Sequence, residues 1–416
     1  MKVHVYGNTL NIAYQYTKFL RAKGIDAEMF LDNTTPYGQD FPWWEDTFLS
    51  PSNLPSWIHY YPSRPFFLFP NKIIRRMIKD FSKCDVALVS CNGPILAMLA
   101  KIPFVFFSMG SDLNSIDVKE ELLSLFKMRN SLSAKMNRLV KILTFTPLQK
   151  RAIQKVASKI IVLMGYQYNP YIRKFGLEYK TVRGRIAYDT DKYFIPVDNE
   201  LFEKNKKYGL LFFMISRHAW KELYADLKGN DKFIRAFAKF VEHFNPNVKL
   251  VLFKKGNDYQ ASENLIRDLG LGKYVEWLEM INKDGVRAYE SLPNCVVVDQ
   301  FWHDEWYKRY PSDRNKAVIG FGFGSIEAAA AGRPLITVFK DEEFYEGNSP
   351  PILTAFTEDE IYDRIVQVYK MSEDERVKMG AEGREFVTKW HRWDNAIDLY
   401  IRELTLIYNE TKGLKQ

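Results

Sequence analysis

The sequence has few cysteines and no long apolar run. Its 416 residues include three cysteines, Cys84, Cys91 and Cys295, which are scattered and odd in number. This pattern argues against a disulfide framework and indicates a reducing compartment. No run of about 18 uncharged apolar residues occurs, so we expect no membrane-spanning helix. The N-terminus lacks the apolar segment and cleavage site of a signal peptide, and we therefore predict a cytoplasmic protein.

Acidic residues are absent between Leu122 and Leu177, and these 56 residues contain eleven lysines and arginines. The whole chain has a net charge of +8, and without those eleven cations its net charge would be −3. The positive charge is therefore local, which favours a specific anionic partner over a generally cationic protein. An anionic membrane surface is the partner that we prefer, and nucleic acid is an alternative that we do not favour.

Length and composition predict two folded domains. A chain this long exceeds the size of one ordinary core, and 46% hydrophobic with 15% aromatic residues can fill two. The first predicted strand leads into the turn Gly7-Asn8. This turn lacks the Gly-x-Gly-x-x-Gly fingerprint, which argues against a dinucleotide-dependent oxidoreductase.

Predicted strands and helices alternate along the chain, which indicates an α/β fold with parallel sheets. The strands expected in a first sheet are Val3–Tyr6, Ala27–Leu31, Val86–Ser90, Phe104–Phe107, Lys159–Leu163 and Thr181–Arg185. Those expected in a second are Leu210–Ile215, Lys249–Phe253, Val275–Trp277, Val296–Asp299 and Leu335–Val338. We predict two Rossmann-like domains that face each other across a ligand cleft. They span residues 1–190 and 205–390, and a C-terminal helix in residues 391–416 packs back on the first.

A glycine-rich segment from Ala317 to Thr337 is the most informative part of the sequence. It opens with alternating glycines and continues as a helix-forming run that contains one acid, Glu327, and ends at Gly332. A helix start of this kind exposes unpaired backbone N–H groups and the positive end of the helix dipole, which favour a phosphate. One turn further, Glu327 could accept hydrogen bonds from the vicinal hydroxyls of a ribose. The residues that would hold a nucleoside diphosphate are Gly322, Phe323, Gly324, Ser325 and Glu327. The alternative is an ordinary loop, helix and strand of an α/β protein.

The same segment resembles the donor-binding signature of GT-B glycosyltransferases, those of family 4 in particular. That signature reads Glu-x-Phe-Gly-x-x-x-x-Glu-Ala-x-Ala-x-Gly-x-Pro. The matching positions are Phe321, Gly322, Glu327, Ala328, Ala330, Gly332 and Pro334. Ile319 takes the place of the first glutamate. The resemblance implies that Glu327 contacts the ribose and that the usual contact to the transferred sugar is missing.

Two cations of the second domain resemble the pair that clamps the donor diphosphate in this family. Arg217 follows the first strand of that domain, and Lys228 opens the next helix in the sequence KGNDKFIRAF. Ser216 replaces the family's glycine, and the spacing between the two cations is longer than usual. Lys221, inside the longer loop, is a rival for the second cation. The structural alternative is a solvated cation at a strand end.

Polar residues follow the predicted strand Val296–Asp299, and some family members carry a similar Val-Asp-Gln. Asp299 is a catalytic candidate because it, or Gln300, could supply the sugar interaction that Ile319 cannot make. Further candidates for that interaction are His303, Asp304 and Glu305. Polar residues that merely cap the end of a strand are the alternative.

The segment Pro103–Ser115 resembles the strand followed by His-Gly-Ser-Asp that the family carries in its first domain. Gly110, Ser111 and Asp112 match this pattern, but Met109 stands at the histidine position. Asp112 is then the one titratable side chain of the segment and the second catalytic candidate. It could instead cap a helix or a turn.

The predicted linker Arg185–Pro196 is similar to the crossover at the end of the family's first domain. It contains Asp189-Thr190-Asp191, the spacing of a metal-binding Asp-x-Asp. Carboxylates at this spacing are common in turns, where they accept hydrogen bonds from backbone N–H groups. We therefore expect no metal ion, and we expect no cofactor beyond the donor substrate.

Two segments of the first domain could recruit an acceptor. Pro36–Pro70 holds seven of the eighteen prolines and eleven aromatic residues, and aromatic rings stack on sugars and favour membrane interfaces. Asn71–Phe81 places apolar residues on one helical face and basic residues beside it. Together with the acid-free stretch after Leu122, this helix predicts a surface for anionic lipid head groups. A loop packed by its own side chains and a helix half-buried in the core are the alternatives.

The resemblance implies a glycosyltransferase with an acceptor-binding first domain and a donor-binding second domain. It would move a sugar from a UDP- or GDP-linked donor to a saccharide or lipid-linked saccharide, with retention of configuration and without a metal. Such an enzyme would be cytoplasmic or peripheral on the inner face of the membrane. Two other functions stay open. A DNA-modifying glucosyltransferase or nucleic-acid binder would use the basic stretch, and a catalytically silent nucleotide-sugar-binding subunit would fit the substitutions at Ile319 and Met109.

Overall fold

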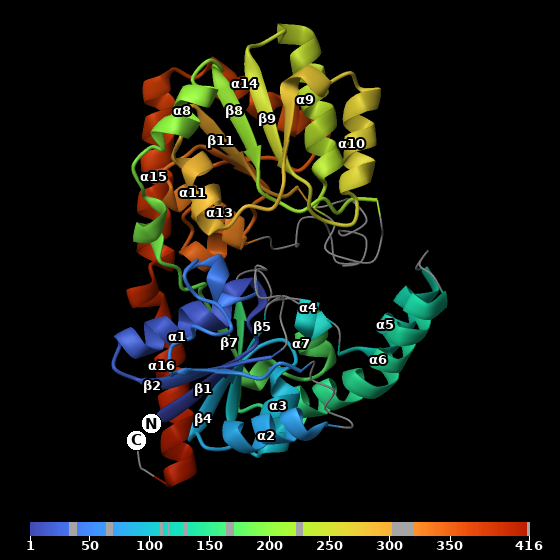
Figure 1. Ribbon diagram of the computed structural model, residues 1–416, viewed down its shortest axis with the longest axis vertical. Coiled ribbons are helices and arrows are strands. Elements are labelled where there is room, and N and C mark those ends of the chain that lie inside the picture. The colour runs from blue at the N-terminus through green and yellow to red at the C-terminus, as the bar shows by residue number, and fades with distance from the viewer. Residues whose placement is uncertain are drawn as a thin grey trace. The chain divides into compact units, whose positions relative to one another are not determined.

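The computed structural model describes residues 1–32, 40–63, 70–108, 111–114, 116–127, 132–163, 170–221, 228–301 and 320–413 (Figure 1). The chain divides into two compact units. Unit 1 consists of Met1–Tyr188 together with Trp393–Gln416, and unit 2 consists of Asp189–Arg392. None of the helices in the described ranges is both long and apolar enough to cross a bilayer.

Unit 1 is built on a parallel sheet whose described strands follow the order β3-β2-β1-β4-β5-β6-β7. Their bounds are β1 Lys2–Tyr6, β2 Asp26–Leu31, β3 Ile58–Tyr60, β4 Val86–Val89, β5 Phe104–Ser108, β6 Lys159–Leu163 and β7 Thr181–Gly184. The central strand β4 is apolar throughout because helices cover both of its faces. Phe104 and Phe106 point into the core formed with α2 and α3. Phe107 points to the other face, where it contacts Tyr16 and Tyr400.

The helices of unit 1 fall between these strands. Their bounds are α1 Ile12–Ala22, α2 Lys72–Phe81, α3 Gly93–Ala100, α4 Ser111–Asn114, α5 Val118–Lys127, α6 Leu132–Arg151, α7 Pro170–Lys174 and α16 Trp393–Lys412. The last of these, α16, packs on α1 and on the sheet. The Tyr400 hydroxyl donates to the carbonyl of Arg185 at 2.9 Å, and Trp393 stacks on Phe19. The final helix of the chain is therefore part of the fold of unit 1.

Unit 2 is also built on a parallel sheet, with its described strands in the order β10-β9-β8-β11-β12-β13. Their bounds are β8 Leu210–Met214, β9 Val248–Phe253, β10 Val275–Leu278, β11 Cys295–Val298, β12 Leu335–Thr337 and β13 Leu353–Thr354. Its helices are α8 Asn199–Asn205, α9 Asn230–Phe244, α10 Tyr259–Asp268, α11 Lys283–Ser291, α13 Phe323–Ala330, α14 Glu358–Lys370 and α15 Glu373–His391. Phe212 packs with α9 on one face of the sheet, whereas Phe213 stacks on Tyr289 of α11 on the other. The prediction of two Rossmann-like α/β units is confirmed.

Two short strands were missing from the predicted set. Strand β3 lies inside the proline- and aromatic-rich segment and has three residues, and β13 has two. Segments this short carry no alternation that a sequence pattern could reveal. Within the described part of that proline-rich segment, Trp44 is buried and Trp57 stacks on Tyr14 with ring centroids 5.7 Å apart. These two rings therefore pack against the rest of unit 1, Trp57 on helix α1.

Helix α2 packs its apolar face into the core of unit 1. Ile74, Met77 and Phe81 are fully buried, whereas the basic residues along the opposite edge are exposed. The side chain of Asn71 accepts a hydrogen bond from the backbone N–H of Ile74 at 2.9 Å and caps the helix. The apolar face of Asn71–Phe81 is therefore engaged by the protein, and the alternative of a half-buried helix describes this segment.

Candidate functional site

The start of α13 lies against the ends of two strands in unit 2. Gly322 precedes the helix in extended conformation and offers no side-chain cap. A Cβ atom on Gly324 would lie 2.4 Å from Cδ1 of Ile215, and one on Gly322 would lie 3.2 Å from the carboxylate of Asp299. The glycines are therefore needed for close approach. They let the first turn of the helix, with Phe323, pack next to the residues that follow β8 and β11.

Asp299 follows β11 and accepts hydrogen bonds from the first turn of α13. The hydroxyl of Ser325 donates to Oδ2 of Asp299 at 2.7 Å, and the backbone N–H of Ser325 donates to the same carboxylate. Burial raises the pKa of Asp299, against the opposing effects of Ser325 and of the charge on Lys228. This geometry is that of a helix cap, whereas the alternative stated for this residue was a polar group that caps the end of its own strand. It also leaves a carboxyl group at the helix start whose charge state can respond to a ligand.

Lys228 and Gln300 lie beside this helix start. The ammonium of Lys228 donates to Oε1 of Gln300 at 2.5 Å. The backbone N–H of Phe301 donates to the carbonyl of Lys228 at 2.8 Å, which holds the segment before α9 against the end of β11. A cation, an amide and the N-terminus of a helix therefore lie close together, and each of them can interact favourably with an anion.

Arg217 lies in a segment that is tied to the same strand ends. On one side of it, the Ser216 hydroxyl donates to the carbonyl of Asp299 at 3.0 Å. On the other side, the backbone N–H of Ala219 donates to the side chain of Asn230 at the start of α9, also at 3.0 Å. The backbone N–H of the rival, Lys221, donates instead to Asp258, next to the start of α10. Of the two rivals for the second cation, Lys228 is the one in contact with Gln300 and close enough to Asp299 to lower its pKa.

Glu327, one turn into α13, is buried and paired with Lys283 at the start of α11. Both side chains are almost fully enclosed, and the ammonium of Lys283 donates to Oε1 of Glu327. Ion pairs that are removed from water are strongly destabilised when one partner is lost. Lys283 therefore holds the carboxylate of Glu327 in place, and Glu327 is the residue that we predicted to contact a ribose.

Lys283 belongs to a polar face of α11 that the sequence analysis did not identify. Arg287 and Glu290 follow it at helical spacing, and the guanidinium of Arg287 lies 4.7 Å from the ring centroid of Tyr193. Both carboxyl oxygens of Glu290 are buried, and neither has a hydrogen-bond partner among the described residues. Burial and the charge of Glu327 raise the pKa of Glu290 well above its ordinary value, although Lys283 and Arg287 oppose this. The sequence did contain a sign of this polar face, because the three charged residues are spaced at i, i+4 and i+7 between two predicted strands, which places them on one side of a helix.

In unit 1, the carboxylate of Asp112 is held by the fold. It accepts hydrogen bonds from the Ser108 hydroxyl at 2.9 Å and from the backbone N–H groups of Leu113 at 2.9 Å and of Cys91 at 3.3 Å. These contacts join the end of β5 to the turn after β4, where Cys91 has a left-handed backbone. The charge of Asp112 also contributes, after burial, to raising the pKa of the Cys91 thiol to about 11. Asp112 thus occupies the turn-capping position that was the alternative to catalysis.

Several predicted positions lie outside the described residues. They are Met109, Gly110, His303, Asp304, Glu305 and Ile319. In the described part of the chain, no group of three or more potential ligands could hold a metal ion. The side chain of Asp189 accepts from the backbone N–H of Lys192, and Asp191 lies 3.4 Å from Arg384 and 3.3 Å from Arg392. The Asp-x-Asp of the linker therefore makes capping and ion-pair contacts within unit 2.

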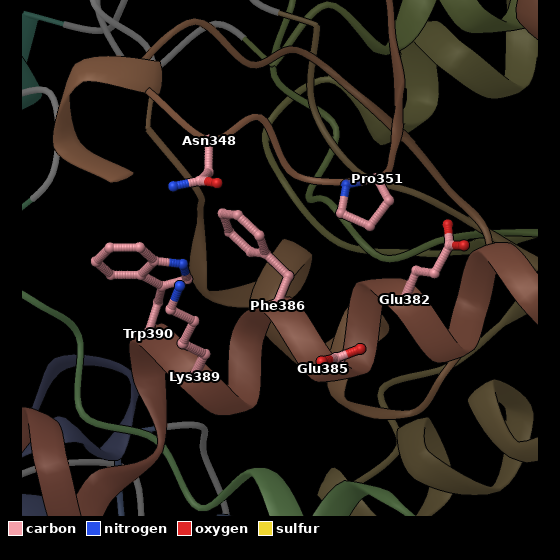
Figure 2. Close-up of a pocket in the computed structure, with 7 residues that line it drawn as sticks. All are labelled: Asn348, Pro351, Glu382, Glu385, Phe386, Lys389 and Trp390. Carbon is pink, nitrogen blue, oxygen red and sulfur yellow. The ribbon is translucent and has the colours of Figure 1, made fainter. Parts of the chain in front are cut away.

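A surface pocket of about 180 Å³ lies on α15 of unit 2 (Figure 2). Figure 2 shows Phe386 and Trp390 extending from this helix towards the loop that carries Asn348 and Pro351. None of the predicted donor-site residues lines this pocket. The polar groups around the start of α13 are therefore the candidate functional site, and the pocket on α15 is a separate feature.

Comparison with known proteins was informative at the level of structure. No protein-family profile matches the chain, and no curated protein matches it by sequence. Among solved structures, HepE from Anabaena in complex with UDP and glucose superposes with a TM-score of 0.65 at 13% identity and covers 97% of this chain and 99% of its own. Sucrose-phosphate synthase from Thermosynechococcus elongatus has a TM-score of 0.61 at 15% identity, covering 97% and 98% of the two chains. A glycosyltransferase from Rickettsia africae has a TM-score of 0.63 at 12% identity, covering 98% and 97%.

The chain has the GT-B fold. Sequence identity to these proteins is low, but the structural superposition covers nearly the whole of each chain. The shared fold therefore includes both units. The predicted resemblance to GT-B glycosyltransferases is confirmed as a likeness of structure. The narrower assignment to family 4 and the roles of individual residues in the GT-B fold stay predictions.

Proposed function

We propose that the chain is a glycosyltransferase that transfers a sugar from a nucleoside-diphosphate donor to a saccharide or a lipid-linked saccharide. The observation that carries this proposal is the group of polar residues around the start of α13, with Lys228 and Gln300 on one side and Glu327 one turn along. Solved structures of the same fold include HepE bound to UDP and to UDP-glucose. UDP and GDP are the donors that we propose to test first.

In this proposal, the start of α13 holds the diphosphate and Lys228 with Arg217 supplies positive charge beside it. Helix N-termini bind phosphate through free N–H groups and the helix dipole. Fixed positive charge also stabilises the diphosphate as it leaves, which lowers the barrier to transfer without a metal ion. Glu327, held by Lys283, accepts hydrogen bonds from the ribose.

Asp299 is our proposed contact to the transferred sugar. Its pKa is already raised by burial, and a diphosphate bound at α13 would raise it further because a negative neighbour disfavours ionisation. A neutral carboxyl can donate a hydrogen bond to a sugar hydroxyl, whereas a carboxylate can only accept one. This assignment would supply the interaction that Ile319 cannot make.

The remaining parts of the proposal concern unit 1 and the setting of the reaction. We propose that unit 1 binds the acceptor and that the protein acts in the cytoplasm or at the inner face of a membrane. A reducing compartment is the setting that the three scattered cysteines suggest. Retention of configuration is the outcome implied by family 4.

The experiment that tests donor binding is a thermal-shift panel of UDP, GDP, ADP, CMP and their sugar conjugates, with and without EDTA. A ligand at a hundred times its Kd adds about 2.7 kcal/mol of stability, which gives a clear shift. We expect one nucleotide series to stabilise the protein in the presence of EDTA and to stabilise Glu327→Gln clearly less. No shift with any nucleotide would contradict the proposal.

A second candidate function is a nucleotide-sugar-binding subunit without catalytic activity. It is favoured by the hydrogen bonds that already occupy Asp112 and Asp299, the two carboxylates proposed for catalysis. Release of free nucleotide from the donor that the panel identifies separates the two functions. Release above the uncatalysed rate, with or without acceptor, supports the transferase, whereas saturable binding without release supports the silent subunit.

A further inference from the structure

Helix α6 of unit 1 exposes a row of large apolar side chains. Leu132 is 77% exposed, Met136 53%, Val140 47% and Leu143 58%. Spacings of four, four and three residues place them on one face of the helix. Ile142, on another face, is buried and anchors α6 to unit 1. Figure 1 shows α5 and α6 extending away from the sheet of unit 1. We call Leu132, Met136, Val140 and Leu143 the α6 stripe.

Positive charge surrounds the stripe. Helix α6 lies entirely within the acid-free residues 122–177, which contain eleven lysines and arginines. At helical spacing, Lys135 lies at one edge of the stripe and Arg151 at the other, and Lys141 is exposed on the same helix. Glu121 lies just before the acid-free residues and forms an ion pair with Arg138 of α6 at 3.1 Å. The surface is therefore apolar at its centre and cationic at its edges.

We propose that the α6 stripe and its flanking cations dock the protein on an anionic lipid bilayer. An apolar helical face buries itself at the boundary between head groups and acyl chains, while lysine and arginine beside it interact with anionic head groups. A second copy of this chain is a poorer occupant, because pairing two such surfaces would bring like charges together. The docking surface shares no residue with the donor site, so this inference goes beyond the proposed function and can fail independently of it.

The test is flotation of the nucleotide-free protein with vesicles of phosphatidylcholine alone and of phosphatidylcholine with 30% phosphatidylglycerol. We expect binding to the anionic vesicles, with a partition coefficient at least about tenfold lower on the neutral ones and at high salt. The stripe variant L132S/M136S/V140S/L143S should bind at least about tenfold more weakly. Its control is M280S/V377S, which removes two exposed apolar side chains of unit 2, 47% and 52% exposed, and should bind like the wild type.

A charge variant separates the contribution of the cations. K135Q/K141Q/R151Q should lose at least about tenfold in affinity for anionic vesicles. The control K207Q/K273Q/K378Q removes the same charge from exposed lysines of unit 2 and should bind like the wild type. Thermal melts of every variant establish that each is folded, which is expected because the altered side chains are largely exposed.

Three results would overturn the inference. The first is the absence of wild-type binding to anionic vesicles, or equal binding by the stripe variant. The second is a wild-type oligomer in light scattering that the stripe variant dissociates, which would make the stripe an interface between copies. The third is salt-sensitive binding to RNA or DNA that the charge variant loses while vesicles are not bound.

Discussion

The two units share an architecture but differ in what lies at the ends of their strands. In unit 2, the residues after β11 meet the start of α13, where Asp299, Gln300 and Lys228 gather. In unit 1, the corresponding polar group after β5 is Asp112, whose carboxylate accepts from three groups of its own fold. The same α/β plan therefore carries a collection of polar side chains in one unit and a structural hydrogen-bond network in the other.

The two units also differ in whether the charges discussed above are exposed or buried. Unit 1 contains the acid-free stretch and the α6 stripe. Unit 2 contains the buried charges of α11 and α13. Lys283 pairs there with Glu327, and the carboxyl group of the nearby Glu290 has no hydrogen-bond partner in the described part of the chain. A charge in contact with water costs little to change, whereas a buried one must be matched. We therefore expect substitutions of these buried charges of unit 2 to act more strongly than substitutions of the exposed cations of α6.

The largest effect is expected for Lys283→Met. The change leaves the carboxylate of Glu327 buried without its cation, next to Glu290, and should destabilise unit 2 by about 3–5 kcal/mol. The matched control is Lys254→Met, which breaks an exposed pair with Glu279 and should leave the stability nearly unchanged. Urea unfolding followed by circular dichroism measures both. Equal losses in the two variants would contradict the importance of the buried pair.

Glu327→Gln should affect donor binding more than stability. A hydrogen bond to a charged group contributes about 1.5–3 kcal/mol, so the affinity for the nucleotide should fall about ten- to a hundredfold. Stability should fall less than in Lys283→Met, because the glutamine oxygen can still accept the hydrogen bond that Lys283 donates to position 327, whereas Lys283→Met leaves a buried carboxylate without its cation. Isothermal titration with UDP and GDP measures the affinity, Glu279→Gln is the control, and unchanged affinity would remove Glu327 from the site.

The fold of both units could largely be predicted from the sequence, because buried parallel strands are short apolar runs between helices. Lys159–Leu163 was predicted with the bounds that the structure has, and the other predicted strands differ by one residue at one or both ends. Strands β3 and β13 are held by pairing with a neighbour in the sheet and carry no pattern of their own. Their positions depend on tertiary structure, which a local sequence pattern does not contain.

The candidate site was predicted only in part, for the same reason. The glycine-rich segment indicates a helix start, and the end of the strand before it indicates Asp299 and Gln300. The partner of Glu327 is 44 residues away in the sequence, and no spacing rule connects Lys283 to it. The α6 stripe was also beyond prediction, since apolar residues at helical spacing indicate a face but not whether the protein covers it.

Asp299→Asn and Asp112→Asn test the difference between the two strand ends directly. Asp112→Asn should lower the stability of unit 1 by about 1–3 kcal/mol, because one of its three donors then faces an amide N–H. Asp299→Asn keeps an acceptor for Ser325 but removes the titratable group. We expect turnover to fall at least about tenfold with nucleotide affinity retained, the pattern of an interaction made with the transferred sugar. Loss of affinity without loss of turnover would assign Asp299 to the nucleotide instead.

The smallest expected effect is a loss of folding stability as the pH is lowered, and the two units should behave alike in this respect. Burial lowers the pKa of His218 in unit 2 and of His4 in unit 1 to about 4 each. Because both are neutral in the folded protein, the unfolded chain binds protons first as the pH falls. The stability from each is therefore present above about pH 6.5 and is lost progressively towards pH 4, by about 1.4 kcal/mol per unit of pH. Urea unfolding at pH 7.0 and 5.5 should show a smaller loss in His218→Gln and in His4→Gln than in the wild type. An equal loss in all three proteins would mean that neither histidine is held neutral by its unit.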